Sequence, residues 1–301
     1  MNDTLLLLPD FALIVLGYLV CHHTALNRPL WDGVERLVYF LLFPALLFNS
    51  VARSAWDPAS MARLAGAGLA LTAAGIALAS ALRAWPRVDP RLHAAGAQTA
   101  FRFNTYVALA LAERLAGARG LAWMAMLVAA CVPLANVAAV WPLARQGGHH
   151  FGRELARNPL ILASVAGLAW RALELPMPAL AATTLARLSA AALPLGLMAV
   201  GAGIRVGALG EGPRLAAALM VIRHALLPAL ALLLVTRLDL APAQQAVLMA
   251  FGAMPTASSA YVLAVRMGGH GAYAAGLVSL STLLGMASMP LWLAAWRAVG
   301  N

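Results

Sequence analysis

The amino-acid sequence predicts an all-α membrane protein with ten transmembrane helices, and two observations lead to this prediction. Of the 301 residues, 62% are hydrophobic and only 11% are charged, whereas a soluble domain usually carries about 25% charged residues. The hydrophobic residues also gather in ten segments, each close to the roughly 20 residues that a helix needs to cross a bilayer. The links between these segments are short, and none has the composition of a soluble domain.

The ten expected spans share a high apolar content and are bounded by links that contain Gly, Pro or charged residues. The first span follows Asp3 instead of a basic stretch, so we expect it to be retained and not removed as a signal peptide. In chain order the spans lie near Leu5–His22, Val34–Ala52, Met61–Leu82, Leu92–Leu115, Leu121–Leu143, Pro159–Leu175, Leu180–Ile204, Leu215–Thr236, Ala243–Met267 and Tyr273–Ala298.

The composition excludes several classes of function. The net charge is +10, but all 21 basic residues are Arg and stand singly between apolar segments. This placement is typical of side chains that anchor helix ends at the membrane surface, and it does not indicate a nucleic-acid partner. Cys21 and Cys131 lie inside apolar segments, without the spacing of a disulfide or metal site. No HExxH, GxSxG, CxxC or phosphate-binding loop is present, so neither an enzyme nor a cofactor is predicted.

The chain reads as two related halves, residues 1–143 and 159–301, joined by the polar link 144–158. Several residues recur at an offset of 150 positions, namely Pro9 and Pro159, Gly17 and Gly167, and Pro44 and Pro194. Five spans is an odd number, so the second half enters the membrane upside down relative to the first. Inverted repeats of this kind are typical of secondary transporters.

The distribution of Arg between the links predicts the orientation. The links on one side of the membrane hold a modest excess of Arg if the N-terminus is outside the cell. Because basic residues are enriched on the cytoplasmic side, we expect both termini outside the cytoplasm and the link 144–158 inside. The expected location is the inner (plasma) membrane.

The ninth span contains a break. Pro255 removes a backbone donor, and Thr256, Ser258 and Ser259 follow it before the apolar run resumes. One interpretation is a kinked helix whose hydroxyls bond their own backbone. The other is a discontinuous helix whose midpoint binds a solute, because backbone left unpaired in lipid must line a cavity or be buried in protein.

The fourth span has polar residues at the equivalent place. Arg102, Asn104 and Thr105 occupy the middle of this span and align with the residues around Pro255. Taken alone, such residues are also consistent with hydrogen bonds that hold two helices together. Because polar groups recur at the centres of two repeated spans, we favour a shared binding site.

Six stretches carry a resemblance to a known family: FRFNT (101–105), NPLILASVAGL (158–168), PLGLMAVGAGI (194–204), RHALLPAL (223–230), MPTASSAYVLAVRMGG (254–269) and STLLGMASMPL (281–291). They resemble the auxin efflux carrier family, which belongs to the wider bile/arsenite/riboflavin transporter-like superfamily. The resemblance spans most of the chain in the family's order, and the MPTA element is its most specific part. One departure is Leu111, where the family usually has a proline. A break of the fourth span therefore has no proline to cause it, and Arg102, Asn104 and Thr105 are the residues that could still unwind it.

The resemblance implies two inverted five-helix repeats whose fourth and ninth helices are broken and cross at the bilayer midplane. The first two helices of each repeat form a scaffold, and the other three move in an elevator-like manner. The substrates implied are carboxylates, either auxin-like or similar to malonate and malate. A homodimer is one assembly that the resemblance implies.

The expected substrate-binding residues lie around the two breaks, with further ones on the scaffold. A helix that restarts after a break presents unpaired N–H groups and a positive dipole end, which favour a carboxylate. Short hydroxyl and amide side chains add donors to this site. The expected set is Arg102, Asn104, Thr105, Pro255, Thr256, Ser258 and Ser259 at the breaks, with Asn49 and Gly201 from the scaffold.

The charged and titratable residues inside or near the spans do not identify the ion that drives transport. Arg223 stands near the middle of the eighth span, where it either supplies charge to the site or pairs with carbonyls inside the protein. His224 is a candidate for proton coupling or a packing residue. Asp10 and Glu113 are expected at the membrane interface and not buried.

Three alternatives to a carboxylate carrier remain at this stage. They are a sodium-coupled transporter similar to bile-acid carriers, a membrane sensor of the same fold that does not transport, and an intramembrane hydrolase that uses Ser258 or Ser259 with His224.

Overall fold

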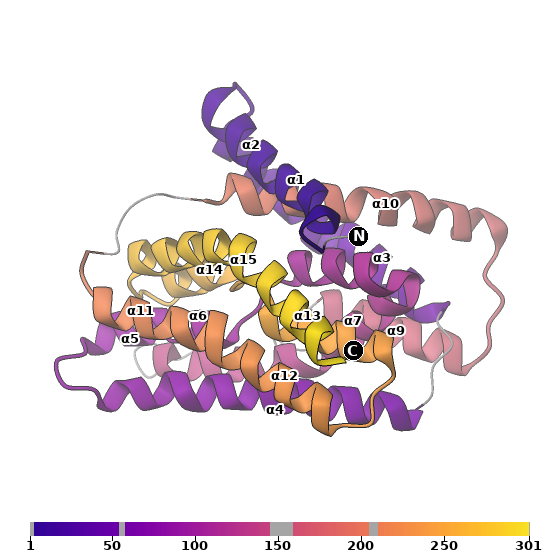
Figure 1. Cartoon of the computed structure of the whole chain (residues 1–301). Helices are drawn as coiled ribbons and strands as arrows, with labels where there is room; N and C mark the ends of the chain where they lie inside the picture. The colour runs from indigo at the N-terminus through magenta and orange to yellow at the C-terminus, as the bar shows by residue number, and fades with distance from the viewer. Residues whose placement is uncertain (1–2, 54–57, 145–158, 205–209, 301) are drawn as a thin grey trace.

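The structure, a computed structural model, describes residues 3–53, 58–144, 159–204 and 210–300. Within these ranges every regular element is a helix (Figure 1). Six helical stretches there are long and apolar enough to cross a membrane, and the apolar helices over Leu8–His23 and Pro159–Ala172 are shorter. The chain is therefore a multi-pass membrane protein. The six stretches are Arg28–Ala52, Met61–Ala84, Pro90–Leu143, Ala179–Ala202, Pro213–Arg237 and Gly271–Val299.

The expected apolar segments fall on helical residues, apart from the interruptions described below, and most of the link 144–158 lies outside the described residues. The first half contains α1 (Asp3–His23), α2 (Arg28–Leu37), η1 (Val38–Leu42), α3 (Phe43–Ala52), α4 (Pro58–Ala81), η2 (Leu82–Ala84), α5 (Pro90–Gly96), α6 (Gln98–Phe101) and α7 (Thr105–Ala144). The second half contains α9 (Pro159–Ala172), α10 (Ala179–Ala202), α11 (Pro213–Val221), η3 (Ile222–Leu226), α12 (Leu227–Arg237), α13 (Pro242–Ala253), α14 (Ser259–Arg266) and α15 (Gly271–Gly300).

The long helix α7 combines the second part of the fourth expected span with the fifth. It is interrupted at Ala116 and at Gly117, whose φ of 59° and ψ of −149° suit glycine. Beyond the interruption, a Cβ on Gly120 would lie 2.2 Å from the carbonyl oxygen of Ala112. The chain therefore packs tightly against the preceding turn here, at the link that the sequence predicts between these two spans.

Two wide π turns lie inside otherwise continuous helices, and each precedes a proline. The turn η1 leads into Pro44, and η3 leads into Pro228. A proline ring clashes with the carbonyl four residues earlier and cannot bond it, so a wider turn relieves the contact. For Pro228 that carbonyl belongs to His224, and the indole Nε1–H of Trp292 donates to it at 2.8 Å. The carbonyl of His224, which the proline cannot bond, therefore has a side-chain donor.

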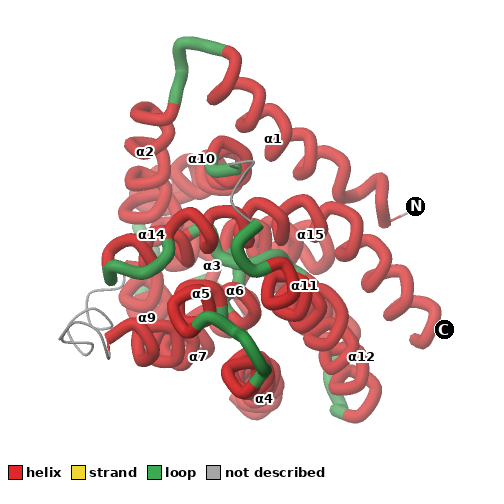
Figure 2. The backbone as a smooth tube through the Cα atoms, turned by 90° about the vertical axis from the view of Figure 1, so that its left-hand side faces the viewer, coloured by secondary structure: helices red, strands yellow, loops and turns green. Residues whose placement is uncertain are grey.

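The helices divide into two groups by their main contacts. In the first group, α1 packs on α10, and α3 packs on both α9 and α10, while α2 also contacts α10. In the second group, α13 packs on α7, α12 and α15, and α4 packs on α7. Figure 2 shows α1, α2 and α10 at one side of the molecule and α4 and α12 at the opposite side. The two groups meet mainly where α7 contacts α3, α9 and α10.

Glycines allow the helices of the first group to approach closely. A Cβ on Gly201 would lie 1.8 Å from the carbonyl oxygen of Ile14, and one on Gly17 would lie 2.0 Å from that of Met198. Helix α1 and α10 therefore touch backbone to backbone, which is how small residues act in membrane helices. Gly201 therefore packs against α1, and we do not carry it into the proposed substrate site.

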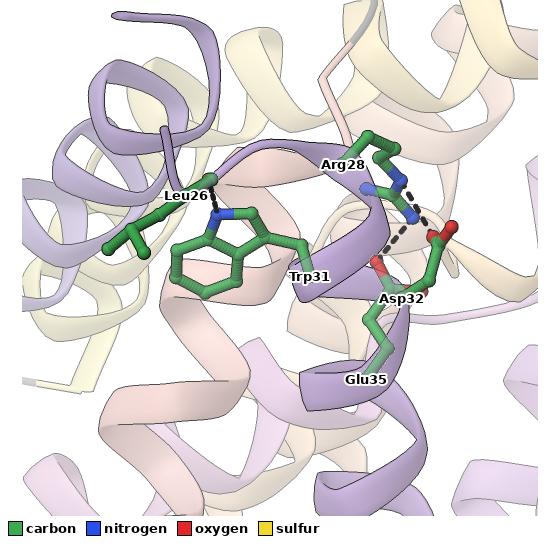
Figure 3. Close-up of polar contacts among 5 residues, drawn as sticks. All are labelled: Leu26, Arg28, Trp31, Asp32 and Glu35. Atoms are coloured by element: carbon green, nitrogen blue, oxygen red, sulfur yellow. Dashed lines mark hydrogen bonds and ion pairs between the residues drawn. The ribbon is translucent and has the colours of Figure 1, made fainter. Parts of the chain in front are cut away.

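A polar cluster at the start of α2 holds the corner between α1 and α2 (Figure 3). The Arg28 guanidinium pairs with Asp32 at 2.9 Å and with Glu35 at 2.7 Å, while the indole N–H of Trp31 donates to the carbonyl of Leu26 at 2.9 Å. The Trp31 ring is buried in a small apolar cluster that includes Ala199 and Ala202 of α10. The corner is thereby anchored to the end of α10.

We expect Gly201→Ala to destabilise the protein by about 1–3 kcal/mol, because the added methyl group has no space next to the α1 backbone. Thermal unfolding in detergent measures this loss. Gly33→Ala in α2 is the matched control, since a Cβ there meets nothing within 4 Å. Equal unfolding temperatures for the two variants would contradict the close packing of α1 on α10.

Candidate functional site

Two helix interruptions meet inside the second group. Residues 102–104 separate α6 from α7, and residues 254–258 separate α13 from α14. The backbone N–H of Asn104 donates to the carbonyl of Pro255 at 2.9 Å, and the hydroxyl of Thr256 donates to the carbonyl of Arg102 at 3.2 Å. The two breaks thus satisfy each other's backbone groups, which apolar surroundings require.

The break between α6 and α7 forms without a proline. Leu111 lies in α7, is buried, and causes no interruption. The side chain of Asn104 accounts for the restart of the helix, because its Oδ1 accepts from the N–H groups of Tyr106 at 3.0 Å and Val107 at 3.2 Å. Asn is among the best residues at this capping position. The interpretation of the fourth span as broken is therefore correct in structural terms, and its cause is a cap.

The capping role changes what Asn104 offers to a ligand. Its oxygen occupies the first N–H groups of α7, so the start of α7 is partly closed to an anion. The residue is only 3% exposed, and its Nδ2 has no hydrogen-bond partner among the described residues. A buried amide donor without a partner costs free energy that a ligand acceptor would recover.

Arg102 carries a charge that no acidic residue balances in the described part of the chain. Its Nη1 donates to Oε1 of Gln98 at 3.0 Å, and its Nη2 donates to Oγ of Ser259 at 3.0 Å. None of the ion pairs among the described residues includes it. A guanidinium has five N–H donors, so Arg102 keeps donors for a further acceptor.

Gln98 supports Arg102, and the sequence reasoning missed it. The side chain is buried, and its Nε2 donates to the carbonyls of Ala95 and Ala260, both at 3.1 Å. It therefore connects α6 to α14 while its oxygen orients Arg102. The sequence does contain an indication of its role, because a Gln one turn before Arg102 is an unusual polar residue in an apolar span.

The start of α14 presents free backbone donors. The N–H groups of Ala260 and Tyr261 close tight turns onto the carbonyls of Ala257 and Ser258 at 3.0 and 3.3 Å. Among the described residues, the N–H groups of Ala257, Ser258 and Ser259 make no hydrogen bond. Consecutive free N–H groups at a helix start form an anion-binding concavity. Ala257 is buried, Ser258 is half-buried and Ser259 is exposed, so this end of the site is accessible.

Arg223 is used inside the protein. It is 2% exposed, its Nε donates to the carbonyl of Met254 at 2.7 Å, and its Nη2 donates to that of Phe251 at 3.4 Å. These carbonyls end α13, where the helix dipole is negative and a cation is favourable. Of the two interpretations of this residue, the structure matches the pairing with carbonyls.

His224 belongs to a hydrogen-bonded chain that ends at the second break. Its Nε2 lies 2.8 Å from Oγ of Ser281, and its Nδ1 lies 2.9 Å from Oγ of Ser288. The same Ser281 oxygen accepts from the backbone N–H of Thr256 at 3.0 Å. Both serines come from α15 and were not assigned from the sequence, although they lie in the stretch 281–291 that carries the family resemblance. His224 therefore stabilises the second break indirectly, through its hydrogen bond to Ser281.

The remaining candidates lie at different distances from the breaks. Thr105 is the first residue of α7 and is half-buried. Asn49 lies in α3, in the first group of helices. Its Oδ1 is buried and has no hydrogen-bond partner among the described residues, so this oxygen does not bond the breaks. A contact that the sequence reasoning missed brings the first group close to the site, because the rings of Phe43 and Tyr106 stack at 4.5 Å.

We expect Arg223→Gln to destabilise the protein by about 1.5–3 kcal/mol, because charge-assisted hydrogen bonds to the end of α13 are lost. Thermal unfolding in detergent measures the effect. Arg237→Gln, at the exposed end of α12, is the control for loss of an Arg charge. An unchanged unfolding temperature in Arg223→Gln would show that these carbonyls do not need the guanidinium.

Comparison with known proteins identifies a family of membrane transporters. The family model described as "Membrane transport protein" matches residues 143–293, half of the chain, and the matched part includes Arg223, His224 and the break around Pro255. No curated protein matches the chain. The chain belongs to this membrane transport protein family, the auxin efflux carrier family, whose members are transporters.

Proposed function

We propose that the protein is a secondary transporter of small organic anions, with mono- or dicarboxylates as the substrate class. One observation carries this proposal: the unpaired guanidinium of Arg102 lies against Ser259, at the start of α14, where three successive N–H groups are free. The family assignment supports a transport role, and the charge of the site selects the anion.

A carboxylate matches the donors at this junction. An Arg guanidinium binds a carboxylate with two parallel hydrogen bonds, and the helix start adds backbone donors on the same side. The unpaired Nδ2 of Asn104 is a further donor that comes from the opposite break. A metal or ammonium ion would instead be repelled by Arg102. Thr105 and Ser258 complete the proposed site with hydroxyl groups. Thr256 belongs to it through its hydrogen bond to the carbonyl of Arg102, and Pro255 shapes it through its carbonyl contact with Asn104.

The proposed movement is elevator-like. The first group of helices would serve as the scaffold, and the second group, which holds both breaks, would carry the anion across the membrane. The hydrogen bonds described above support this division, because the breaks bond each other and residues of α6, α7, η3, α14 and α15, and none of these bonds goes to α1, α3, α9 or α10.

The proposal includes ten spans arranged as two inverted repeats, residues 1–143 and 159–301. A pair of equivalent contacts supports it. Gly17 packs on the carbonyl of Met198, and Gly167, 150 positions later, packs on that of Phe48, 150 positions earlier. An exchange of partners at a constant offset is what an approximate twofold axis between repeats produces. We further propose the inner (plasma) membrane as the location, with both termini outside the cytoplasm.

We expect purified protein in liposomes to exchange labelled malonate, and Arg102→Gln to lower this exchange by at least about tenfold, the equivalent of one lost charge-assisted hydrogen bond. Arg102→Lys should retain part of the exchange, because it keeps the charge and loses the fork geometry. Arg83→Gln, an exposed residue of η2, is the control. Wild-type exchange in Arg102→Gln would refute the site, and sodium-dependent uptake would favour a sodium-coupled carrier.

Two substitutions of Asn104 separate its capping role from its role toward the anion. Asn104→Ser keeps an oxygen that caps α7 but removes the Nδ2 donor, so we expect near-normal stability and reduced malonate exchange. Asn104→Ala removes both and should also cost about 1 kcal/mol of stability. Thermal unfolding and exchange measured on the same preparations test this. Normal exchange by the Ser variant would mean that the amide does not contact the substrate.

A further inference from the structure

Asp10 is a buried carboxylate at the boundary between the two helix groups. It lies in α1, is 8% exposed, and its Oδ1 accepts from Nη2 of Arg114 in α7 at 3.3 Å. Its Oδ2 is buried and has no hydrogen-bond partner among the described residues. The expectation that Asp10 is not buried is therefore wrong, whereas Glu113 is exposed as expected.

The surroundings of Asp10 are almost entirely apolar. Asp10 lines a small cavity together with residues of α1, α7, α10 and α15. All these other lining residues are apolar, among them Leu111, Leu197 and Met289. Glycine contacts hold α1 firmly on α10, so Asp10 is fixed to the first group. An oxygen left without a partner in such a place is costly.

The pair of Asp10 and Arg114 is the ion pair that joins the two groups in the described part of the chain. The other pairs lie within one group: Arg28 with Asp32 and Glu35 in α2, Arg63 of α4 with Asp239 beside α12, and His270 with Glu211. A displacement of α7 along α1 would therefore separate Asp10 from Arg114. It would leave the other ion pairs of the described residues intact.

Separation of Arg114 from Asp10 favours protonation of the Asp10 carboxylate. Arg114 is 42% exposed in its side chain and can take its charge to water, but Asp10 stays among apolar residues. A buried carboxylate without a counter-ion costs several kcal/mol, so it binds a proton instead. A metal cation does not fit here, because it needs several oxygen ligands and the carboxylate is the one oxygen-bearing side chain that lines the cavity.

We infer that Asp10 is the proton-binding residue that couples carboxylate transport to a proton gradient, with Arg114 as the counter-charge that it exchanges for the proton. This inference rests on the proposed function. When α7 moves away, Oδ2 takes one proton from solvent, and when Arg114 returns, that proton is released. The charged groups that face Asp10 from α7 are Arg114 and the more distant Glu113, and no titratable residue of α10 or α15 lines the cavity.

The first arm of the test does not depend on transport. Infrared spectroscopy of the protein in lipid nanodiscs follows the carbonyl band of a protonated carboxylic acid as the pH is changed. We expect the pH-dependent band to contain a component that Asp10→Asn removes and that Asp32→Asn, on the exposed face of α2, retains. Arg114→Gln should change the pH dependence of this component, since the counter-charge of Asp10 is gone. A band unchanged in Asp10→Asn would overturn the inference.

The second arm measures labelled malonate in liposomes with and without a pH gradient. We expect the gradient to accelerate wild-type uptake several-fold, and Asp10→Asn to keep malonate exchange at equal pH while losing the acceleration. If Asp10→Asn does not fold, Arg114→Gln carries the test through its shifted pH profile.

The outcomes of the two arms are distinguishable. Wild-type exchange with no effect of the gradient overturns the coupling role of Asp10 and leaves the carboxylate carrier intact. The Asp10 band without any malonate transport supports the proton site and contradicts malonate as the substrate. Replacement of sodium by choline should change neither arm, and a loss of uptake on this replacement would overturn proton coupling.

Discussion

The structure depends on how two interrupted helices pair their backbone groups inside an apolar protein. A helix that stops within a membrane leaves N–H and C=O groups without partners, and lipid offers none. Here each break supplies partners to the other through the contacts of Asn104 with Pro255 and of Thr256 with Arg102. The side chains of Arg223 and Ser281 then take the groups that remain at the end of α13 and after Pro255. The N–H groups of Ala257, Ser258 and Ser259 at the start of α14 stay without a partner among the described residues.

This division of hydrogen bonds gives the two intramembrane arginines different roles. Arg223 is buried and donates hydrogen bonds to carbonyls at the end of α13, so its charge offsets the dipole of that helix. Arg102 bonds only the neutral side chains of Gln98 and Ser259, so its charge is not balanced within the described residues. The first is part of what holds the break open, and the second is available to an anion. Their positions in the sequence do not distinguish them, because both stand near the middle of an apolar span.

The boundary between the two helix groups differs from the interior of the first group in the kind of contact that holds the helices together. Within the first group, glycines bring α1 against α10 with backbone contacts that leave no room to move. At the boundary, the contacts of α7 include side-chain contacts, such as the stacking of Phe43 on Tyr106 and the ion pair of Asp10 with Arg114. Side-chain contacts of this kind can be exchanged at lower cost than interlocked backbones. The one ion pair described at this boundary also has a free oxygen, and this makes the boundary sensitive to protons in our proposal.

By itself, the sequence determined the helical class, the multi-pass membrane character, the family and the location of the break around Pro255, because these depend on local composition and on proline chemistry. It also identified Arg102 and Asn104 as unusual, since polar residues stand out in an apolar span. Only the tertiary structure decided what each polar residue bonds: that Asn104 caps α7, that Gly201 packs on α1, and that Arg223 closes α13. It likewise brought Gln98, Ser281 and Asp10 to their partners from distant parts of the chain. Composition reports which groups must be satisfied inside a membrane, whereas the partner that satisfies each one depends on which helices lie side by side.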